Sequence, residues 1–392
     1  MPIEVFALIL LTVWGACVGS FLNVVIYRVP AGLSVISPPS RCPGCEKKLA
    51  AYDNVPVLGW LWLKGKCRNC KMKISVQYPL VESATALLFF GLTYAYYFTD
   101  LRMPFAGSEL VDTWPVLAVH LVLLSCMIAA TMIDAKLYII PLSLTWIAAG
   151  VAILVLPGSV AMGWVPAELL AVGQSYDMLI PVTDQIGLAI GGTAGLIVAI
   201  ILLQMKILPL SFAEEIPLPE GADPDDPNLI LVHPHPRREI GKELLFLIFP
   251  LVGAGVGFVL DQFVFAAEAT AEGEVVRDPL WQAIGGVLLG YLAGGGIVWA
   301  TRVLGTLGFG KEAMGLGDVH LMAAVGAVIG WRDTTLAFFI APFFGIIAAV
   351  VTAGVAALVK GKVRVIPYGP YLCGATLVVM IWRQPILDAI FP

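Results

Sequence analysis

Charged residues are scarce in this sequence, since Asp, Glu, Lys and Arg together make up 13% of its 392 residues. Soluble domains carry about 25%, so an ordinary soluble domain is excluded. The formal net charge is only −5 and the chain has no basic run, so we expect no nucleic-acid partner. A Gly-rich strand–turn–helix signature is also missing, so the sequence does not indicate a nucleotide-binding fold.

Hydrophobic residues, by contrast, make up 59% of the chain and gather in long runs. The first run lacks a basic n-region and a small-residue cleavage site, so we interpret it as a retained span. A helix needs about 20 apolar residues to cross a bilayer core. Ten segments are predicted to do so: 3–26, 79–98, 114–133, 138–156, 186–205, 243–265, 281–301, 318–331, 335–358 and 371–391. Residues 318–331 are short, so this segment needs tilt or burial among its neighbours.

Every backbone polar group in lipid must be satisfied within its own segment, so these spans are expected to be helices. The predicted fold class is an all-α polytopic membrane protein, with the lipid bilayer as a partner. We divide the chain into a first helix (1–26), a cytoplasmic loop with paired cysteines (27–78), helices carrying Asp134 (79–156), an insertion with two extra helices and a Pro/Asp-rich linker (157–280), and helices carrying Asp318 (281–392).

The positions of Lys and Arg predict the orientation. If residues 27–78 are cytoplasmic, alternating sides place most basic residues inside, while loop 157–185 has none. The inner ones are Arg28, Arg41, Lys47, Lys48, Lys64, Lys66, Arg68, Lys71, Lys73, Lys206, Arg237, Arg238, Lys242, Arg302, Lys311, Lys360, Lys362 and Arg364, and the outer ones are Arg102, Arg277, Arg332 and Arg383. This asymmetry satisfies the positive-inside rule. Both termini are then outside, and Asp134 and Asp318 both lie at cytoplasmic helix ends.

A faint internal similarity joins DQIGLAIGGTAGL (184–196) and PLWQAIGGVLLGY (279–291). It is typical of a duplicated helix. Small-residue packing between membrane helices explains it equally well.

The seven cysteines divide into a quartet and three isolated residues. Cys42-Pro-Gly-Cys45 and Cys67-Arg-Asn-Cys70 form two Cys-x-x-Cys pairs at a spacing that can close a tetrahedral zinc site. A closed site of four thiolates leaves no position for substrate, so its role is expected to be structural. Two disulfides, disfavoured in the cytoplasm, and a reduced, metal-free quartet are the alternatives. The isolated residues, in apolar stretches, are expected to be small buried side chains: Cys17, Cys126 and Cys373.

Two carboxylates lie at the ends of predicted spans. Asp134 ends the apolar run that begins at residue 120, and Asp318 follows EAMGLG (312–317). Ionisable groups in membrane segments are costly and usually functional. Two carboxylates in a partly dry site can share one proton, so that one acts as general base and the other as general acid. Gly315 and Gly317 would let an extended peptide backbone approach closely.

Simpler interpretations exist for each residue. Asp318 at a helix start is typical of a capping residue, and Asp134 could pair with Lys136. Glu82, in the second segment, could pack beside a basic residue. A transporter with carboxylates along its path would explain the residues nearly as well as a hydrolase.

Longer motifs decide between these possibilities. The chain resembles the type IV prepilin peptidases, which are intramembrane aspartic proteases of the GxGD type. The resemblance runs through GACVGSFLNVVIYRVP (15–30), the two cysteine pairs, YDNVPVLGWLWLKGKC (52–67), ISVQYPLVE (74–82), MIDAKLYIIP (132–141), EAMGLGDVHL (312–321) and AVGAVIGW (324–331). It covers the first 150 residues and roughly 280–391, with motifs that are specific in length and order.

The resemblance implies that Asp134 and Asp318 are catalytic, in the Ile-Asp and Gly-x-Gly-Asp motifs. It implies cleavage of type IV prepilins or pseudopilins after a Gly, at the cytoplasmic face of a bacterial inner membrane. Gly315, Gly317, His320, Lys136 and Glu82 are then expected near the active site or substrate. Many members also methylate the new N-terminus with S-adenosylmethionine, but the sequence does not indicate which residues would bind this cofactor.

The sequence departs from the family pattern at several positions. Leu142 replaces a frequent second Asp, so Asp134 is the only carboxylate of its motif. His320 replaces a frequent Lys, and Gln77 replaces an Arg. Residues 157–280 fit no part of the expected eight-helix pattern. A GxGD protease of other specificity and a non-enzymatic transporter or assembly factor remain the alternative functions.

Overall fold

The computed structural model describes residues 2–102, 108–166, 180–212, 235–265, 268–269, 275–359 and 367–390. The Pro/Asp-rich run of the predicted linker lies outside these ranges. The long helices are α1 (Ile3–Arg28), α3 (Gln77–Tyr97), α4 (Leu110–Leu137), α5 (Leu142–Ala161), α6 (Ile186–Gln204), α7 (Pro236–Val264), α8 (Pro279–Phe309), α9 (Leu316–Val359) and α10 (Gly369–Ile390). Shorter elements are η1 (Ala51–Asp53), α2 (Leu58–Trp62) and the antiparallel pair β1 (Glu268–Ala269) and β2 (Val275–Val276).

The predicted all-α membrane fold is confirmed, and each of the ten predicted segments coincides with a long helix or half of one. Residues 318–331 and 335–358 are the two halves of α9, which are separate helices joined at a break at Gly330, where φ is +81°. A residue with a Cβ rarely adopts that conformation. The second half runs back beside α10, since Asp333 pairs with Arg383 and Gly345 packs on Tyr371. In the described part of the chain, eight helices are long and apolar enough to span a membrane. The Tyr-rich α3 is not among them, although it packs along α1.

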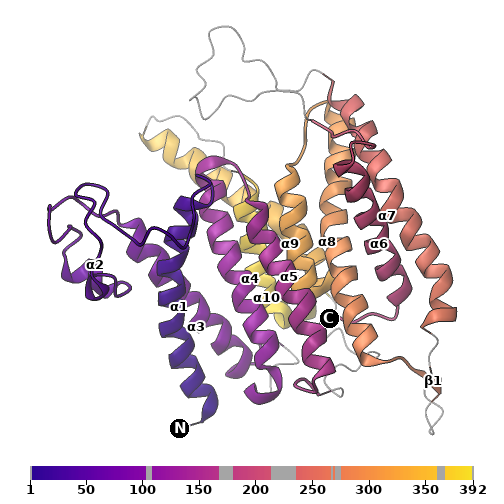
Figure 1. Cartoon of the computed structure of the whole chain (residues 1–392), viewed down its shortest axis with the longest axis horizontal. Helices are drawn as coiled ribbons and strands as arrows, with labels where there is room; N and C mark the ends of the chain where they lie inside the picture. The colour runs from indigo at the N-terminus through magenta and orange to yellow at the C-terminus, as the bar shows by residue number, and fades with distance from the viewer. Residues whose placement is uncertain are drawn as a thin grey trace.

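Successive long helices run in alternate directions when the two halves of α9 are counted separately (Figure 1). The ends of α1, α4, α6 and α8 therefore share one end of the bundle with the starts of α3, α5, α7 and α9. We call this the basic end, because the connections there carry most of the Lys and Arg residues counted above. The N-terminus lies at the opposite end (Figure 1). The alternation predicted from charge is thus the alternation that the helices follow.

Glycines let two helix pairs approach closely. A Cβ on Gly257 of α7 would lie 2.0 Å from the carbonyl oxygen of Gly187 in α6. A Cβ on Gly326 of α9 would lie 2.0 Å from the carbonyl oxygen of Gly290 in α8. Such contacts are the usual form of small-residue packing in membranes. The similarity between residues 184–196 and 279–291 therefore has a packing explanation, and duplication stays a prediction.

The core lies where α3, α4, α5, α9 and α10 meet, among side chains such as Leu92, Leu123, Ala152 and Val325. The first half of α9 is largely buried there, which is how its short span is accommodated. Cys373 is buried as expected and Cys126 is partly buried. The expectation for Cys17 was wrong, because this side chain is exposed on α1. On a helix that faces lipid, an apolar side chain needs no protein cover.

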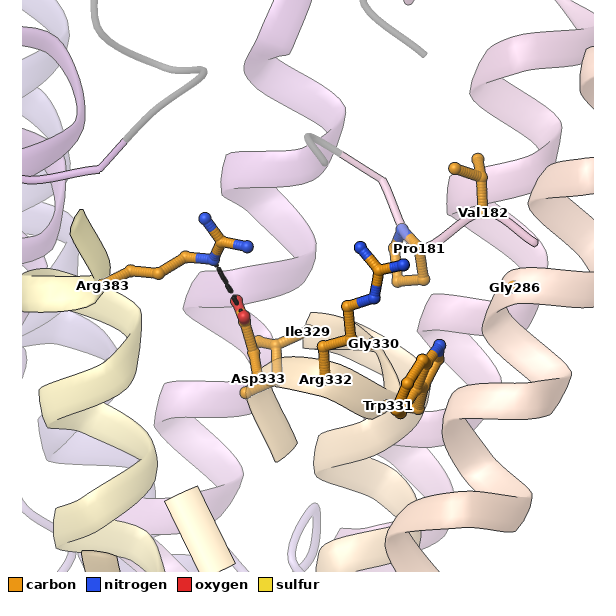
Figure 2. Close-up of a pocket in the computed structure, with 9 residues that line it drawn as sticks. All are labelled: Pro181, Val182, Gly286, Ile329, Gly330, Trp331, Arg332, Asp333 and Arg383. Carbon is orange, nitrogen blue, oxygen red and sulfur yellow. Dashed lines mark hydrogen bonds and ion pairs between the residues drawn. The ribbon is translucent and has the colours of Figure 1, made fainter. Parts of the chain in front are cut away.

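An ion cluster occupies the opposite end, beside the bend of α9. The Asp333 carboxylate accepts hydrogen bonds from Arg383 Nε at 2.8 Å and from Arg102 Nη2 at 3.2 Å. Figure 2 shows Arg383 bonded to Asp333 at the edge of a small cavity that Gly330 also lines. Arg102 also donates to the carbonyl oxygen of Val379 at 3.3 Å. This cluster joins the connection before α4 to α9 and α10.

Candidate active site

Asp134 lies in the last turn of α4. The helix ends three residues later, and Tyr138 adopts a left-handed conformation with its N–H donating to the Asp134 carbonyl oxygen at 2.9 Å. The Asp134 residue is only 5% exposed. A carboxyl group in this place is withdrawn from water, although it sits at the very end of a span.

Asp318 is the third residue of α9 and is 8% exposed. The Gly315 N–H hydrogen-bonds to its carboxylate. An acidic side chain at the third helical position that bonds back to the residue before the helix is half of a capping box. Asp318 therefore takes part in capping α9 through this one hydrogen bond. Its carboxylate has further lone pairs that can meet a substrate or a second carboxyl group.

The two aspartates meet at the basic end of the bundle. They are close enough for their charges to interact, and the segments around them are in contact. A Cβ on Gly317 would lie 3.1 Å from Cβ of Ile140, in the connection that follows Asp134. The ends of α4 and the start of α9 thus form one site from two motifs that are 184 residues apart (318 − 134).

A third segment, at the start of α10, completes this site, and the sequence did not single it out. The Gly369 N–H hydrogen-bonds to the Asp134 carboxylate. A Cβ at this glycine would lie 2.5 Å from Asp134 Oδ2, so only a glycine fits there. The signal in the sequence is Gly369-Pro370, which marks a helix start but says nothing of a carboxylate partner.

Tyr368 lies next to this glycine and was likewise missed. Burial and the nearby Asp318 charge raise the pKa of Tyr368 to about 12. The phenol therefore stays protonated at neutral pH and can donate a hydrogen bond beside the carboxyl pair. A Tyr before a helix has no sequence feature that distinguishes it from an interfacial anchor.

The other predicted site residues lie in different surroundings. The Lys136 ammonium donates to the Gln77 side-chain oxygen, and the ion pairs of the described residues do not join it to Asp134. Glu82 is buried in α3 and accepts a hydrogen bond from the Val57 N–H at 2.6 Å, so it anchors the segment before α2. His320 is partly buried in the first turns of α9.

The four paired cysteines form a compact cluster between α1 and α3. Their sulfurs all lie within 4.8 Å of one another, and Cys42 Sγ lies 3.6 Å from Cys70 Sγ. Zn–S bonds of about 2.3 Å in a tetrahedron require S–S separations of about 3.8 Å, so the quartet fits zinc. Hydrogen bonds from the N–H groups of Cys70 and Asn69 lower the pKa of Cys67 to about 6, which favours the thiolate that binds metal.

The same local structure is repeated in the two halves of this cluster. Cys42 N–H bonds to the Lys47 carbonyl oxygen at 3.1 Å, and Cys67 N–H bonds to the Met72 carbonyl oxygen at 2.9 Å. Each half closes with a residue at positive φ, Glu46 and Lys71. The repeat indicates two equivalent knuckles, as expected for a closed structural metal site.

Comparisons with known proteins agree with this arrangement. The chain matches the bacterial peptidase A24 N-terminal domain over residues 13–96 and the type IV leader peptidase family over residues 244–350. The second match begins earlier than the motifs suggested, and it includes most of α7. No solved structure matches the chain.

Several curated proteins are similar to it. A prepilin leader peptidase/N-methyltransferase of Myxococcus xanthus is 46% identical over 35% of this chain and 36% of that protein. Proteins of the same name from Aeromonas salmonicida and Stutzerimonas stutzeri are 26% and 25% identical, over 98% and 95% of this chain and 94% and 90% of those proteins. The first match spans about a third of its relative, and the other two span nearly the whole length. The chain thus carries the matches of two domains, an A24 N-terminal domain and, behind it, a domain of the type IV leader peptidase family.

Proposed function

We propose that this protein is a membrane aspartic endopeptidase that removes the leader from type IV prepilins or pseudopilins. Asp134 and Asp318 are the catalytic pair in this proposal. The single observation that carries it is the meeting of two buried carboxylates, one ending α4 and one beginning α9, at a site bordered by glycines. The names of the relatives support the substrate class.

The chemistry needs one proton between the two carboxyl groups. The ionised group takes a proton from water as the water oxygen bonds to the scissile carbonyl carbon, and the protonated group gives its proton to the carbonyl oxygen. The tetrahedral intermediate then collapses: one of its hydroxyls returns a proton to the carboxylate that gave one, the C–N bond breaks, and the nitrogen takes up the proton that came from water. The pair titrates as a unit, so neither role belongs to one aspartate at all pH values.

The glycines of the site suit a peptide backbone as substrate. Gly315, Gly317 and Gly369 surround the carboxylates without a Cβ, so an extended chain can approach the pair closely. In the proposed substrate, the residue before the scissile bond is a Gly. The substrate backbone therefore also lacks a Cβ at the point where it meets the aspartates. The location at the basic end supports cleavage at the cytoplasmic face, by the positive-inside rule. His320, Lys136 and Glu82 remain proposed neighbours of substrate or site.

The decisive experiment uses two isosteric variants and one matched control. Asp134→Asn and Asp318→Asn should each lower prepilin cleavage by about 10⁴-fold or more, as loss of one member of a catalytic unit does. Asp112→Asn, in the first turn of the same helix α4, should cleave normally. Near-normal cleavage by either active-site variant would reject the assignment. The same assay separates this function from a protease of other specificity and from a transporter.

N-methylation is a second proposed activity, because the relatives that match nearly the whole chain are named peptidase/N-methyltransferases. The methyl donor would be S-adenosylmethionine. Incubation of the enzyme with cleaved pilin and labelled S-adenosylmethionine should place label on the new N-terminus. If cleaved pilin stays unlabelled while cleavage is normal, the methylation proposal fails and the peptidase proposal stands.

The cysteine quartet is proposed to hold one structural zinc ion. With four protein ligands, the ion has no open position, so it supplies no catalytic step. Metal analysis of protein purified without chelators should give one zinc per chain, and Cys42→Ser/Cys67→Ser should give none. Absence of zinc from the parent protein would contradict this proposal.

A further inference from the structure

Arg302 is an arginine buried inside the bundle, and its partners come from three different segments. The side chain, in α8, is fully buried. Its Nε donates to Glu243 Oε1 at 3.0 Å, and its Nη1 donates to Glu312 Oε1 at 2.5 Å. The guanidinium also lies over the Phe212 ring, 4.8 Å from its centroid. The cation is therefore held between α7, the connection after α6 and the connection after α8.

The same guanidinium reaches the turn that precedes the catalytic glycines. Arg302 Nη1 also donates to the carbonyl oxygen of Met314, and Met314 directly precedes Gly315, whose N–H bonds to the Asp318 carboxylate. Arg302 is close enough to Asp318 for their charges to interact. A contact to the carbonyl of Met314 therefore fixes the peptide unit whose N–H group meets the catalytic carboxylate.

The turn between α8 and α9 is also tied down one residue earlier. The Ala313 N–H donates to Thr306 Oγ1 at 3.2 Å. A Cβ on Gly305 would lie 2.6 Å from the Ala313 side chain, so the turn packs directly on α8. Ala313 is thus held by the Thr306 hydroxyl and by its packing on α8, and Met314 by the arginine. The position of the Gly-x-Gly segment depends on the second of these contacts.

Glu243 of α7 orients Arg302. It is buried, and it also accepts hydrogen bonds from Trp299 Nε1 at 2.7 Å and Ser211 Oγ at 3.2 Å. One helical turn earlier, Glu239 accepts from the Phe212 N–H at 2.8 Å and pairs with Lys242. Two buried glutamates of α7 thus hold both the arginine and the connection that packs over it.

Such a network is poorly explained by stability alone. Removing an arginine and a glutamate from water costs about as much as their attraction returns, so a buried pair is often no more stabilising than apolar side chains. Its advantage is geometry. A guanidinium has five N–H groups in a fixed plane and can bind a carboxylate and a carbonyl together, whereas a Lys ammonium has no such fork.

We propose that Arg302, oriented by Glu243, is a positioning residue that holds the Met314–Gly315 peptide in register with Asp318. This inference rests on the proposed peptidase function and assigns a role in it to α7, a helix of the region 157–280. Arg302 does not touch substrate in this scheme. It acts on the reaction through the backbone that meets the catalytic carboxylate.

The test compares two ion pairs of α7. Arg302→Met should lower kcat for prepilin cleavage by about 10²-fold, the usual cost of a misplacement near 1 Å, while KM stays unchanged. Arg302→Lys should recover part of this loss. Glu243→Gln should lower kcat as Arg302→Met does. The double variant Arg302→Met/Glu243→Gln should be no slower than Arg302→Met alone. The matched control is Arg277→Met, because Arg277 pairs with Asp261 of α7 at 2.6 Å at the opposite end.

Thermal unfolding of each variant in detergent measures the fraction of folded enzyme. It therefore separates an effect on the position of the Met314–Gly315 peptide from a general loss of stability. A positioning role requires that kcat per folded enzyme falls for the Arg302 and Glu243 variants but not for Arg277→Met. The inference would be overturned if the Arg302, Glu243 and Arg277 variants all lost activity equally, and only in proportion to the fraction of unfolded protein. If Arg302→Met does not fold, Arg302→Lys and Glu243→Gln carry the same comparison, and normal kcat in both rejects it.

The failure of this inference is distinguishable from failure of the proposed function. Asp318→Asn is assayed in parallel on the same prepilin. If Asp318→Asn is inactive and the Arg302 variants are normal, only the positioning role is wrong. If Asp318→Asn cleaves normally, the peptidase assignment itself is wrong.

Discussion

The first half of α9 has a buried arginine–carboxylate cluster at each end. At its start, Arg302 binds two glutamates and the Met314 carbonyl oxygen, next to Asp318. At its bend, Asp333 binds two arginines, Arg102 and Arg383. The pair with Arg383 is drawn in Figure 2. The residue types are the same, but the backbone that each cluster holds is different. The first holds a turn that leads into the proposed catalytic motif, and the second ties α9 to α10 and to the connection before α4.

The role of a buried ion pair therefore depends on which backbone segment it holds in place. At the bend, Arg102 contacts the carbonyl oxygens of Val379 and Met380, just before the kink of α10 at Trp382. At the start of α9, the arginine contact lies one residue from a glycine that bonds to Asp318. Changes at the first cluster should therefore alter catalysis, and changes at the second should alter stability.

The largest expected effect is at the carboxyl pair itself. The double variant Asp134→Asn/Asp318→Asn should be no slower than either single variant, because residues that act as a unit lose their effect together. Single-turnover cleavage of prepilin measures this. If the fold-decreases of the two single variants multiplied, the double variant would be far slower than each single one. That result would show that the aspartates act independently.

The next effect is expected at the glycine that faces Asp134. Gly369→Ala would place a Cβ 2.5 Å from Asp134 Oδ2, so the carboxylate must move, and kcat should fall by about 10²-fold. Gly296→Ala is the matched control, since a Cβ there has no neighbour within 4 Å. Normal cleavage by Gly369→Ala would mean that Asp134 tolerates displacement and would weaken the geometric argument.

At the bend, we expect a loss of stability without a loss of catalysis. Asp333→Asn removes the carboxylate that Arg102 and Arg383 share, and removal of one partner from a buried pair costs about 3–5 kcal/mol. The free energy of unfolding in detergent should fall by that amount, while kcat per folded enzyme stays at the parent value. Asp388→Asn, on the exposed face of α10, should change neither. A lower kcat for Asp333→Asn would remove the contrast between the two clusters.

The smallest effect on cleavage is expected at the cysteine quartet. Cys42→Ser/Cys67→Ser should abolish zinc binding and loosen the segment between α1 and α3, because a structural zinc site supplies folding energy. Prepilin cleavage should stay close to that of the parent, since the proposed catalytic aspartates come from α4 and α9. Limited proteolysis measures the loosening. A complete loss of cleavage in a folded variant would give the cysteine region a direct part in the peptidase site.

Much of the fold follows from the sequence because a bilayer allows few choices. Apolar runs near 20 residues must be helices, and the distribution of Lys and Arg predicts their alternate directions. Gly330 escaped this reasoning. Its φ of +81° marks the break between the two helices of α9, which are the two predicted spans, but a glycine in a membrane segment equally suits simple close packing.

The candidate site was only partly predictable for a related reason. Asp134 and Asp318 stand out because charges are rare in spans, and the cysteine pairs stand out by spacing. Gly369 and Glu243 do not, because their importance lies in what they touch across the fold. The expectation that Cys17 is buried in protein was wrong because an apolar stretch of a membrane helix can face lipid as readily as protein.

The sequence by itself determined the helices, their directions and the end at which both aspartates lie, because hydropathy and charge act along the chain. Only the tertiary structure decided that α10 supplies a glycine to Asp134 and that α7 supplies a glutamate to Arg302. Those contacts join residues that are 235 (369 − 134) and 59 (302 − 243) positions apart. Contacts of this kind depend on how helices pack, and packing is a property of pairs of surfaces that no single segment contains.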